Sequence, residues 1–267
     1  MKDMKDKILL FIPMYNCEKQ ITRVLDQLTD EVSSYLSEVI IVNNRSTDNG
    51  EDAVLDYLEN TSPKVRTILL RNDENYGLGG SHKVAFDYAL EHGFDYVIVL
   101  HGDDQGNIDN LLPYLRSGAY SRFDCFLGAR FMKGSSLQGY SAFRTFGNRV
   151  YNILFSFVCG TKIRDLGSGL NMYKTDILES GFYEKYPDNL MFNYCMIMGS
   201  CHFGHKICFF PISWREDDQV SNVKMTSQAI KVLKLLLDFA IDKSAFVRAE
   251  HRDVVIDDYS ANRVRRV

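Results

Sequence analysis

The sequence predicts an α/β fold whose mainly parallel central sheet is covered by helices on both faces. In the first half of the chain, short apolar runs alternate with segments that have the apolar spacing of amphipathic helices. The runs are apolar at almost every position, so both faces of each strand should be buried, as in a parallel sheet. The length of 267 residues suits one such domain.

The elements follow from this pattern in chain order. Strands are expected at 7–13, 38–43, 65–70 and 96–100, with helices around 21–28, 52–59 and 81–91 between them. The second half predicts strands at 124–130, 170–173 and 207–212, with helices at 143–158 and 225–242. We expect one domain over 1–242, made of two halves at 1–116 and 117–242, and a loose tail at 243–267.

Composition and charge exclude several classes of protein. The net charge of −4 argues against nucleic acid as a partner. The six cysteines are scattered without a C-x-x-C pair, which indicates reduced, buried thiols and not disulfides or a zinc site. No apolar run reaches the length of a membrane span, so a cytoplasmic protein is expected, with any membrane contact peripheral and at the inner face.

Polar residues and glycines follow the four predicted strands of the first half. In parallel sheets, ligands bind beyond the carboxyl ends of the strands. Aromatic and amide side chains there suit a base or a ribose, and glycines let backbone N–H groups approach a phosphate. The glycines follow the third strand and not the first, which argues against a dinucleotide-binding dehydrogenase. The candidate nucleotide-sugar ligands are Pro13, Tyr15, Asn16, Asn43, Asn44, Gly77, Gly79, Gly102 and Asp103.

The fourth strand ends in His101-Gly102-Asp103-Asp104-Gln105. Acids beside a buried strand are costly unless they are paired or bind a metal ion. Oxygen atoms of Asp103 and Gln105 suit Mg²⁺ or Mn²⁺ that also holds a pyrophosphate, and His101 could be a further ligand. The alternative is a solvated acidic turn that caps a helix at 107–115.

In this order, the four strand ends resemble those of the family-2 glycosyltransferases. The second half resembles a narrower group, the dolichyl-phosphate mannose synthase-like and polyprenyl-phosphate glycosyltransferases, and the resemblance spans about residues 7–225. Three positions depart from the family pattern: Asn43 and Asn44 replace an acidic pair, and His101 replaces the first acid of the metal motif. The matching segments of the second half are Gly128-Ala-Arg130-Phe131, Arg144 with Gly147-Asn148 and Asn152, Asp165-Leu-Gly-Ser168-Gly169, and Pro211-Ile212 followed by Arg215, Ser221 and Lys224.

The resemblance implies a nucleotide-sugar glycosyltransferase of the type A fold, with a nucleotide-binding half at 1–116 and an acceptor half at 117–242. Such an enzyme moves a sugar, with inversion, from a UDP- or GDP-type donor to a polyprenyl-phosphate acceptor, with Mg²⁺ or Mn²⁺ as cofactor. It implies catalytic roles for Asp103, Gln105 and Arg215. The implied acceptor-binding residues are Arg130, Arg144, Asn148, Asp165, Ser168, Arg215, Ser221 and Lys224.

Several alternatives remain open at this stage. Each of the arginines could instead form a surface ion pair. The acceptor could be a sugar hydroxyl in polysaccharide or glycan synthesis, and it would then need a general base, for which Asp165, Glu216, Asp217 and Asp218 are candidates. The protein could also be a non-catalytic sugar-nucleotide-binding module.

The helix at 225–242 has one charged stripe, so its apolar remainder must be covered by the core, a second subunit of a homodimer or a bilayer.

Overall fold

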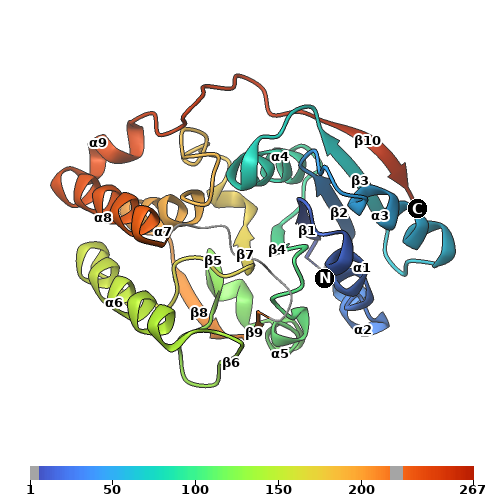
Figure 1. Ribbon diagram of the computed structural model, residues 1–267, viewed down its shortest axis with the longest axis horizontal. Coiled ribbons are helices and arrows are strands. Elements are labelled where there is room, and N and C mark those ends of the chain that lie inside the picture. The colour runs from blue at the N-terminus through green and yellow to red at the C-terminus, as the bar shows by residue number, and fades with distance from the viewer. Residues whose placement is uncertain (1–5, 217–224) are drawn as a thin grey trace, which may run out of the picture.

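A computed structural model describes residues 6–216 and 225–267. In this part of the chain, one 8-stranded sheet has the strand order β10-β3-β2-β1-β4-β7-β5-β8, and β6 pairs with β9 in a separate ribbon (Figure 1). The strands are β1 Ile8–Met14, β2 Glu38–Asn43, β3 Thr67–Asn72, β4 Tyr96–Leu100, β5 Cys125–Ala129, β6 Ser136–Gln138, β7 Leu170–Lys174, β8 Ile207–Pro211, β9 Ser213–Arg215 and β10 Ala261–Arg266.

The first four strands pair in parallel and carry the helices that the periodicity predicts. β7 runs antiparallel to both β4 and β5, and β10 runs antiparallel to β3. The α/β fold with a mainly parallel sheet is therefore confirmed. The helices are α1 Glu18–Asp26, α2 Asp30–Tyr35, α3 Gly50–Asn60, α4 Gly77–Glu91, α5 Leu112–Ser117, α6 Ala142–Cys159, α7 Phe192–His202, α8 Met225–Ile241 and α9 Lys243–Arg248.

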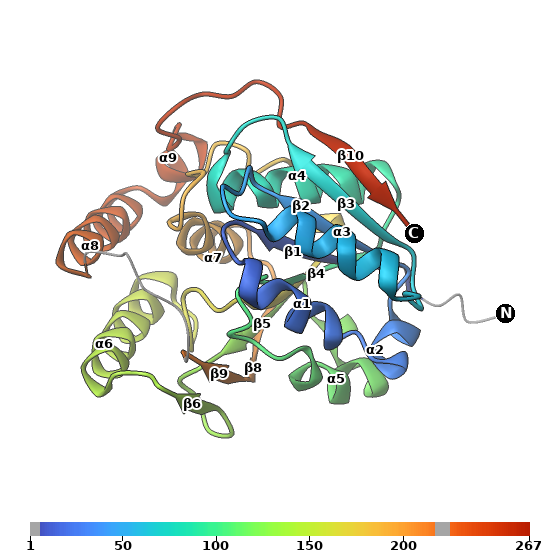
Figure 2. The same ribbon diagram turned by 45° about the vertical axis from the view of Figure 1, so that its right-hand side comes forward.

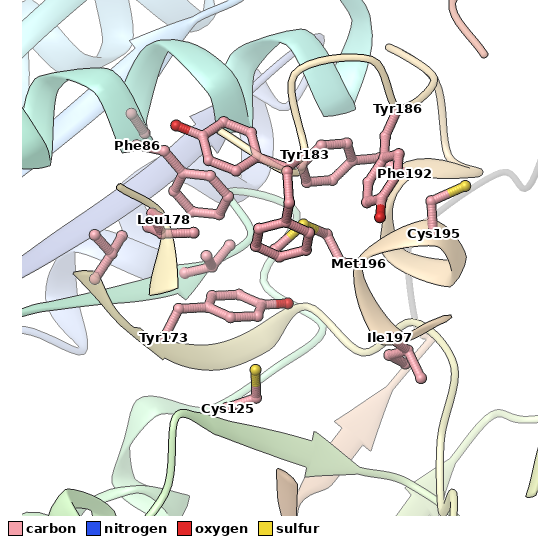
Figure 3. Close-up of a cluster of buried hydrophobic side chains, with 14 of the residues drawn as sticks. Phe86, Cys125, Tyr173, Leu178, Tyr183, Tyr186, Phe192, Cys195, Met196 and Ile197 are labelled. Carbon is pink, nitrogen blue, oxygen red and sulfur yellow. The ribbon is translucent and has the colours of Figure 1, made fainter. Parts of the chain in front are cut away.

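Helices cover both faces of the sheet (Figure 2). The side chains of β1 alternate between the two faces. Leu9 and Phe11 belong to the core formed with α4 and α7. Leu10 and Ile12 belong to the core formed with α1 and α3. The first of these cores is rich in aromatic rings from α4, α7 and the chain before α7, as Figure 3 shows. Two complete cores hold the carboxyl ends of the strands in fixed positions.

The expectation of a loose tail at 243–267 is wrong. This segment contains α9 and then β10, which becomes the outermost strand beside β3. Asp73 accepts hydrogen bonds from Ser260 and Asn262 and so fixes the register of the new strand. The charged sequence of β10 hides this role, because an edge strand can expose most of its side chains.

α7 has no counterpart among the predicted elements. Most of its residues are buried all around the helix, so the sequence shows no amphipathic periodicity there. Among the described residues, none of the helices combines the length and the hydropathy needed to cross a bilayer.

Candidate functional site

The carboxyl ends of β1, β2 and β4 meet at one edge of the sheet. The amide of Gly102 donates to the carbonyl of Pro13 at 3.1 Å, and the amide of Asn44 donates to the carbonyl of Met14 at 2.9 Å. A Cβ atom at Gly102 would lie 2.9 Å from the Pro13 oxygen, so only glycine permits this contact. The backbone thus joins the turn after β1 to the start of the acidic segment after β4.

The two neighbouring acids of this segment, Asp103 and Asp104, have different surroundings. Asp104 is buried, and its carboxylate accepts from Arg23 Nε at 2.6 Å, Gln27 Nε2 at 3.0 Å and Arg215. Its φ of 59° is a left-handed value that the surrounding contacts must hold in place. Asp104 is therefore an internal anchor, because two arginines and a glutamine occupy its carboxylate.

Asp103 has a different environment. Its side chain is partly buried, and its Oδ1 accepts from the amide of Gln105 at 3.2 Å. Burial, together with the negative charge of Asp104, raises the pKa of Asp103 from 3.8 to about 6. A carboxylate that is poorly stabilised in its charged form is a group that a cation would stabilise.

Arg215 lies beside the acids because β9 reaches across to the turn after β4. Its amide donates to the carbonyl of Gln105 at 3.0 Å, and its Nε donates to the carbonyl of Asp104 at 2.8 Å. The adjacent Trp214 is bridged to Gly106. The structure therefore brings Asp103, Gln105 and Arg215 together, as predicted, but the Arg215 guanidinium is paired with Asp104.

His101 begins the acidic segment and packs under Gly169. A Cβ atom at Gly169 would lie 2.9 Å from Cγ of the imidazole. Burial lowers the pKa of His101 to about 4, so the ring is neutral at pH 7. Its Nε2 is buried without a hydrogen-bond partner, and the ring of His82, a residue that sequence reasoning missed, lies 6.3 Å away between centroids.

The donor set fits a hard divalent cation that is shared with a substrate. Within residues 6–216 and 225–267, no three His, Cys, Asp or Glu side chains converge on a closed metal site. Mg²⁺ and Mn²⁺ are commonly held by one or two carboxylates while substrate phosphates and water complete the shell. The carboxylate of Asp103 and the amide oxygen of Gln105 are oxygen donors of this kind.

At the end of β2, Asn43 is tied to a charged network. Its Nδ2 donates to Glu51 Oε2 at 2.6 Å, and its Oδ1 accepts from the amide of Ser46 at 2.9 Å. Glu51 is also paired with Arg71, whose hydrogen bond holds the pKa of the Glu51 carboxyl below its usual value. Sequence reasoning missed Glu51, although it stands in the first turn of α3, close behind Asn43.

Asn16 and Asn44 link loops to one another. Asn16 Oδ1 accepts from the amide of Thr47 at 2.7 Å. Asn44 is buried and bridges Asn72 at 2.9 Å and Asn75 at 2.8 Å. The Asn44 amide is thus used inside the protein, which corrects the expectation that it contacts a nucleotide. Tyr15, by contrast, is exposed beside this edge.

The glycines after β3 do not form a phosphate cradle. The amide of Gly79 donates to the carbonyl of Asp188 at 2.7 Å, and the amide of Gly77 donates to Asn75 Oδ1 at 3.1 Å. A Cβ atom at Gly79 would lie 2.8 Å from Cβ of Phe192. The glycines therefore let the start of α4 pack against the chain before α7, and the prediction of phosphate contacts by Gly77 and Gly79 is wrong.

Arg130 and Asp165 form a buried pair after β5. The guanidinium of Arg130 donates through Nε and Nη2 to the two carboxylate oxygens, at 2.8 Å each. Burial disfavours the guanidinium charge, but the adjacent Asp165 carboxylate outweighs it and raises the pKa of Arg130. The indole of Trp214 lies 4.9 Å from Cζ of Arg130. This pair is held rigidly beside the acidic segment and is not a surface ion pair.

Two more of the predicted acceptor residues, Arg144 and Asn148, lie on α6. Arg144 pairs with Glu216 and lies over the ring of Tyr140 at 4.4 Å, and Asn148 donates to Tyr140 Oη at 3.0 Å. Ser168 is buried and hydrogen-bonds locally to Leu170. Ser221 and Lys224, with the base candidates Asp217 and Asp218, lie outside the described residues.

Comparison with known proteins identifies the family. The family model described as glycosyl transferase family 2 matches residues 10–182. The chain belongs to this family. Its α/β sheet also matches solved glycosyltransferase structures: a mannosyltransferase from Pyrobaculum calidifontis in complex with GDP-Man and Mn²⁺ has a TM-score of 0.59 at 16% identity, over 92% of this chain and 66% of that one. Glucosyl-3-phosphoglycerate synthase from Mycobacterium tuberculosis, in complex with UDP, has a TM-score of 0.60 at 12% identity, over 88% and 80%.

Curated relatives of this family-2 glycosyltransferase include lipid-phosphate sugar transferases. The chain is 23% identical over 176 residues to polyprenol monophosphomannose synthase of Mycolicibacterium smegmatis, covering 65% of this chain and 63% of that protein. It is 25% identical over 174 residues to undecaprenyl-phosphate mannosyltransferase of Micrococcus luteus, covering 65% and 69%. The match therefore spans about two thirds of the length of these relatives.

Proposed function

We propose that this family-2 glycosyltransferase transfers a sugar, with inversion, from a nucleoside diphosphate to a polyprenyl-phosphate acceptor. The observation that supports it most is the partly buried Asp103, with a raised pKa, beside Gln105 at the joined ends of β1 and β4. The names of the relatives favour a lipid-phosphate acceptor. Because the relatives use such acceptors, we also propose that the protein works at a membrane surface.

Asp103 and Gln105 would hold the divalent cation, Mg²⁺ or Mn²⁺, and the pyrophosphate of the donor would share it. When bound, the cation supplies positive charge to the departing nucleoside diphosphate. Asp104, which Arg23, Gln27 and Arg215 fix in place, holds the turn so that Asp103 keeps its position. Tyr15 and the network of Asn43 with Glu51 lie at the adjoining edge, where we place the base and the ribose.

An acceptor phosphate is already anionic, so its oxygen can attack the anomeric carbon without a general base. Arg144, which is half-buried, would bind this phosphate, and the buried Arg130 would add positive charge to the site. Glu216 is paired with Arg144, so a phosphate that displaces it would release a carboxylate to solvent. This arrangement favours a phosphate over a sugar hydroxyl, because the described base candidates Glu216 and Asp165 are both held by arginines.

Purified protein can be tested with UDP and GDP, each with and without Mn²⁺. A bound donor product should raise the melting temperature in a cation-dependent manner, because only the folded state binds it. Transfer is then measured from a panel of UDP- and GDP-sugars to a short-chain, water-soluble prenyl phosphate. No shift with either nucleotide would contradict the donor site, and transfer only to a sugar hydroxyl would contradict the acceptor.

A further inference from the structure

α6 exposes a continuous apolar stripe to solvent in the described structure. The stripe repeats every three or four residues, which places its members on one side of the helix. Phe143 is 75% exposed and Phe157 is 88% exposed, so these rings gain almost nothing from the fold around them. The exposed members of the stripe are Phe143, Phe146, Val150, Ile153, Leu154 and Phe157.

α8 extends this stripe into a wider surface. Its exposed apolar residues are Ile230, Leu233, Leu237 and Ile241. The two helices are neighbours, since Tyr151 Oη of α6 donates to the carbonyl of Ala229 in α8 at 3.0 Å. Figures 1 and 2 both show them side by side on the side of the molecule opposite β10. We call the exposed apolar residues of α6 and α8 together the apolar face.

Cations border the apolar face. On α6, the exposed Arg149 stands beside the stripe, and the helix contains no acidic residue. On α8, the exposed Lys231 and Lys234 stand beside the apolar stripe, with Asp238 as the acid of that helix. Long basic side chains next to an apolar stripe can extend to lipid phosphates while the apolar residues enter the acyl layer. The charge and the apolar residues thus complement an anionic bilayer.

We propose that the apolar face docks on an anionic lipid bilayer, with α6 and α8 lying in the plane of the interface. The side of α6 opposite this face carries Arg144 and Asn148, which hydrogen-bond or stack on Tyr140 inside the protein. Docking would therefore place these residues directly above the lipid headgroups. The proposal rests on the proposed function in one respect, since that bilayer would present the polyprenyl phosphate to them.

A second copy of the chain is a poorer occupant of the same face. A two-fold interface places the same patch on both subunits, so Arg149, Lys231 and Lys234 of both copies would gather around one apolar interface. Like charges in an apolar interface oppose association, whereas an anionic membrane neutralises them.

The test is vesicle flotation of the full chain without any sugar donor. Vesicles of phosphatidylcholine with phosphatidylglycerol should carry the protein upward, and vesicles of phosphatidylcholine alone should carry less of it. The double variant Phe146→Ser/Phe157→Ser should bind at least about tenfold more weakly, because two exposed rings no longer enter the acyl layer. Two single variants form a matched comparison: Ile153→Ser lies on the apolar face and Val254→Ser lies away from it, and the two side chains are equally exposed, at 69% and 68%. Only Ile153→Ser should weaken binding.

Several results would overturn docking: no flotation of the wild-type protein, equal flotation of the folded double variant, or a dimer that the double variant dissociates while neither form floats. Thermal melting of each variant shows that it is folded. The proposed function is tested separately from docking by measuring transfer to a short-chain prenyl phosphate in solution. Phe146→Ser/Phe157→Ser should leave this transfer unchanged, while transfer to a long-chain acceptor in vesicles should fall. Flotation without transfer to either acceptor would contradict the function and leave docking intact.

Discussion

Asp103 and Asp104 are neighbours in the sequence, yet the turn after β4 gives them opposite surroundings. Asp104 is enclosed by two arginines and a glutamine, which stabilise its charge. Asp103 accepts from the amide of Gln105 and experiences the repulsion of its acidic neighbour. Because Asp104 has a left-handed backbone conformation, the two side chains have different surroundings. Asp104 anchors the turn, and Asp103 would hold a cation.

Asp103→Asn should abolish transfer and stabilise the fold when no cation is present. The pKa of Asp103 is raised from 3.8 to about 6, so the folded state binds the proton more tightly than the unfolded state. Between these values the free energy of unfolding falls as pH rises, and the loss is complete above about pH 6. Removing the charge should recover up to about 3 kcal/mol at pH 7.5.

Urea melts of the wild type and of Asp103→Asn at pH 4 and pH 7.5 measure this difference. The gain should be full at pH 7.5 and small at pH 4, because at pH 4 the carboxyl of the folded wild type is protonated and that of the unfolded chain is only about half ionised. Cation affinity of the wild type should also fall as the pH drops below about 6. If the wild type and Asp103→Asn are equally stable at both pH values, and the variant has normal turnover, Asp103 belongs to a solvated turn.

Asp104→Asn should have the opposite effect on stability. Asparagine keeps one acceptor oxygen but loses the negative charge and turns an NH2 donor toward these donor groups. The guanidinium groups of Arg23 and Arg215 are nearly half-exposed, so water compensates in part. The expected loss in the free energy of unfolding is about 1–3 kcal/mol. Glu31→Gln, which breaks the exposed pair with Arg116, is the control and should leave the urea midpoint unchanged.

At the scale of elements, α4 begins at glycines that accommodate another part of the chain. The carbonyl of Asp188 accepts from Gly79, and the side chain of Asp188 accepts from the buried Lys83 at 2.7 Å and from Tyr259 at 2.8 Å. Burial lowers the pKa of Lys83, while the hydrogen bond to Asp188 opposes this shift. The start of α4, the segment before α7 and the segment before β10 are thereby joined around one acid.

Gly79→Ala should destabilise the protein by several kcal/mol, because the added methyl group would lie against the carbonyl of Pro187 and 2.8 Å from Cβ of Phe192. Gly147→Ala is the matched control inside α6, since a methyl group there would meet no atom within 4 Å beyond its own helix. That change should stabilise the helix by up to about 1 kcal/mol. Thermal melts should separate the two variants, and equal melting temperatures would contradict the close packing at Gly79.

For the whole molecule, the apolar alternation of strands and helices was sufficient to predict seven of the eight strands of the central sheet, all except β10. The sequence also predicted that Asp103, Gln105 and Arg215 would come together. It could not predict the partners of Arg130 and Arg144, because Asp165 and Glu216 are far away along the chain. Nor could it show that Asp188 occupies the amide of Gly79, since a glycine-rich turn has the same sequence whether it faces a phosphate or a carbonyl.

Removing residues 259–267 should lower the free energy of unfolding and promote self-association. The truncation deletes Tyr259, which bonds Asp188, and uncovers the edge of β3 that β10 protects. Melting and light scattering measure the two effects. Arg263→Ala/Arg265→Ala is the control, because it keeps the backbone pairing of β10 and should behave like the wild type. A truncated protein that melts normally and stays monomeric would contradict this role.

The position of β10 also bears on the order in which the chain can fold during its synthesis. Asp73 at the end of β3 meets Asn262 across 189 residues of sequence. A ribosome makes about 5–20 residues per second, so β3 spends roughly 10–40 seconds as an open strand edge before its neighbour emerges. During this interval the nascent chain can pair wrongly with other chains, which makes the early sheet a natural client for chaperones.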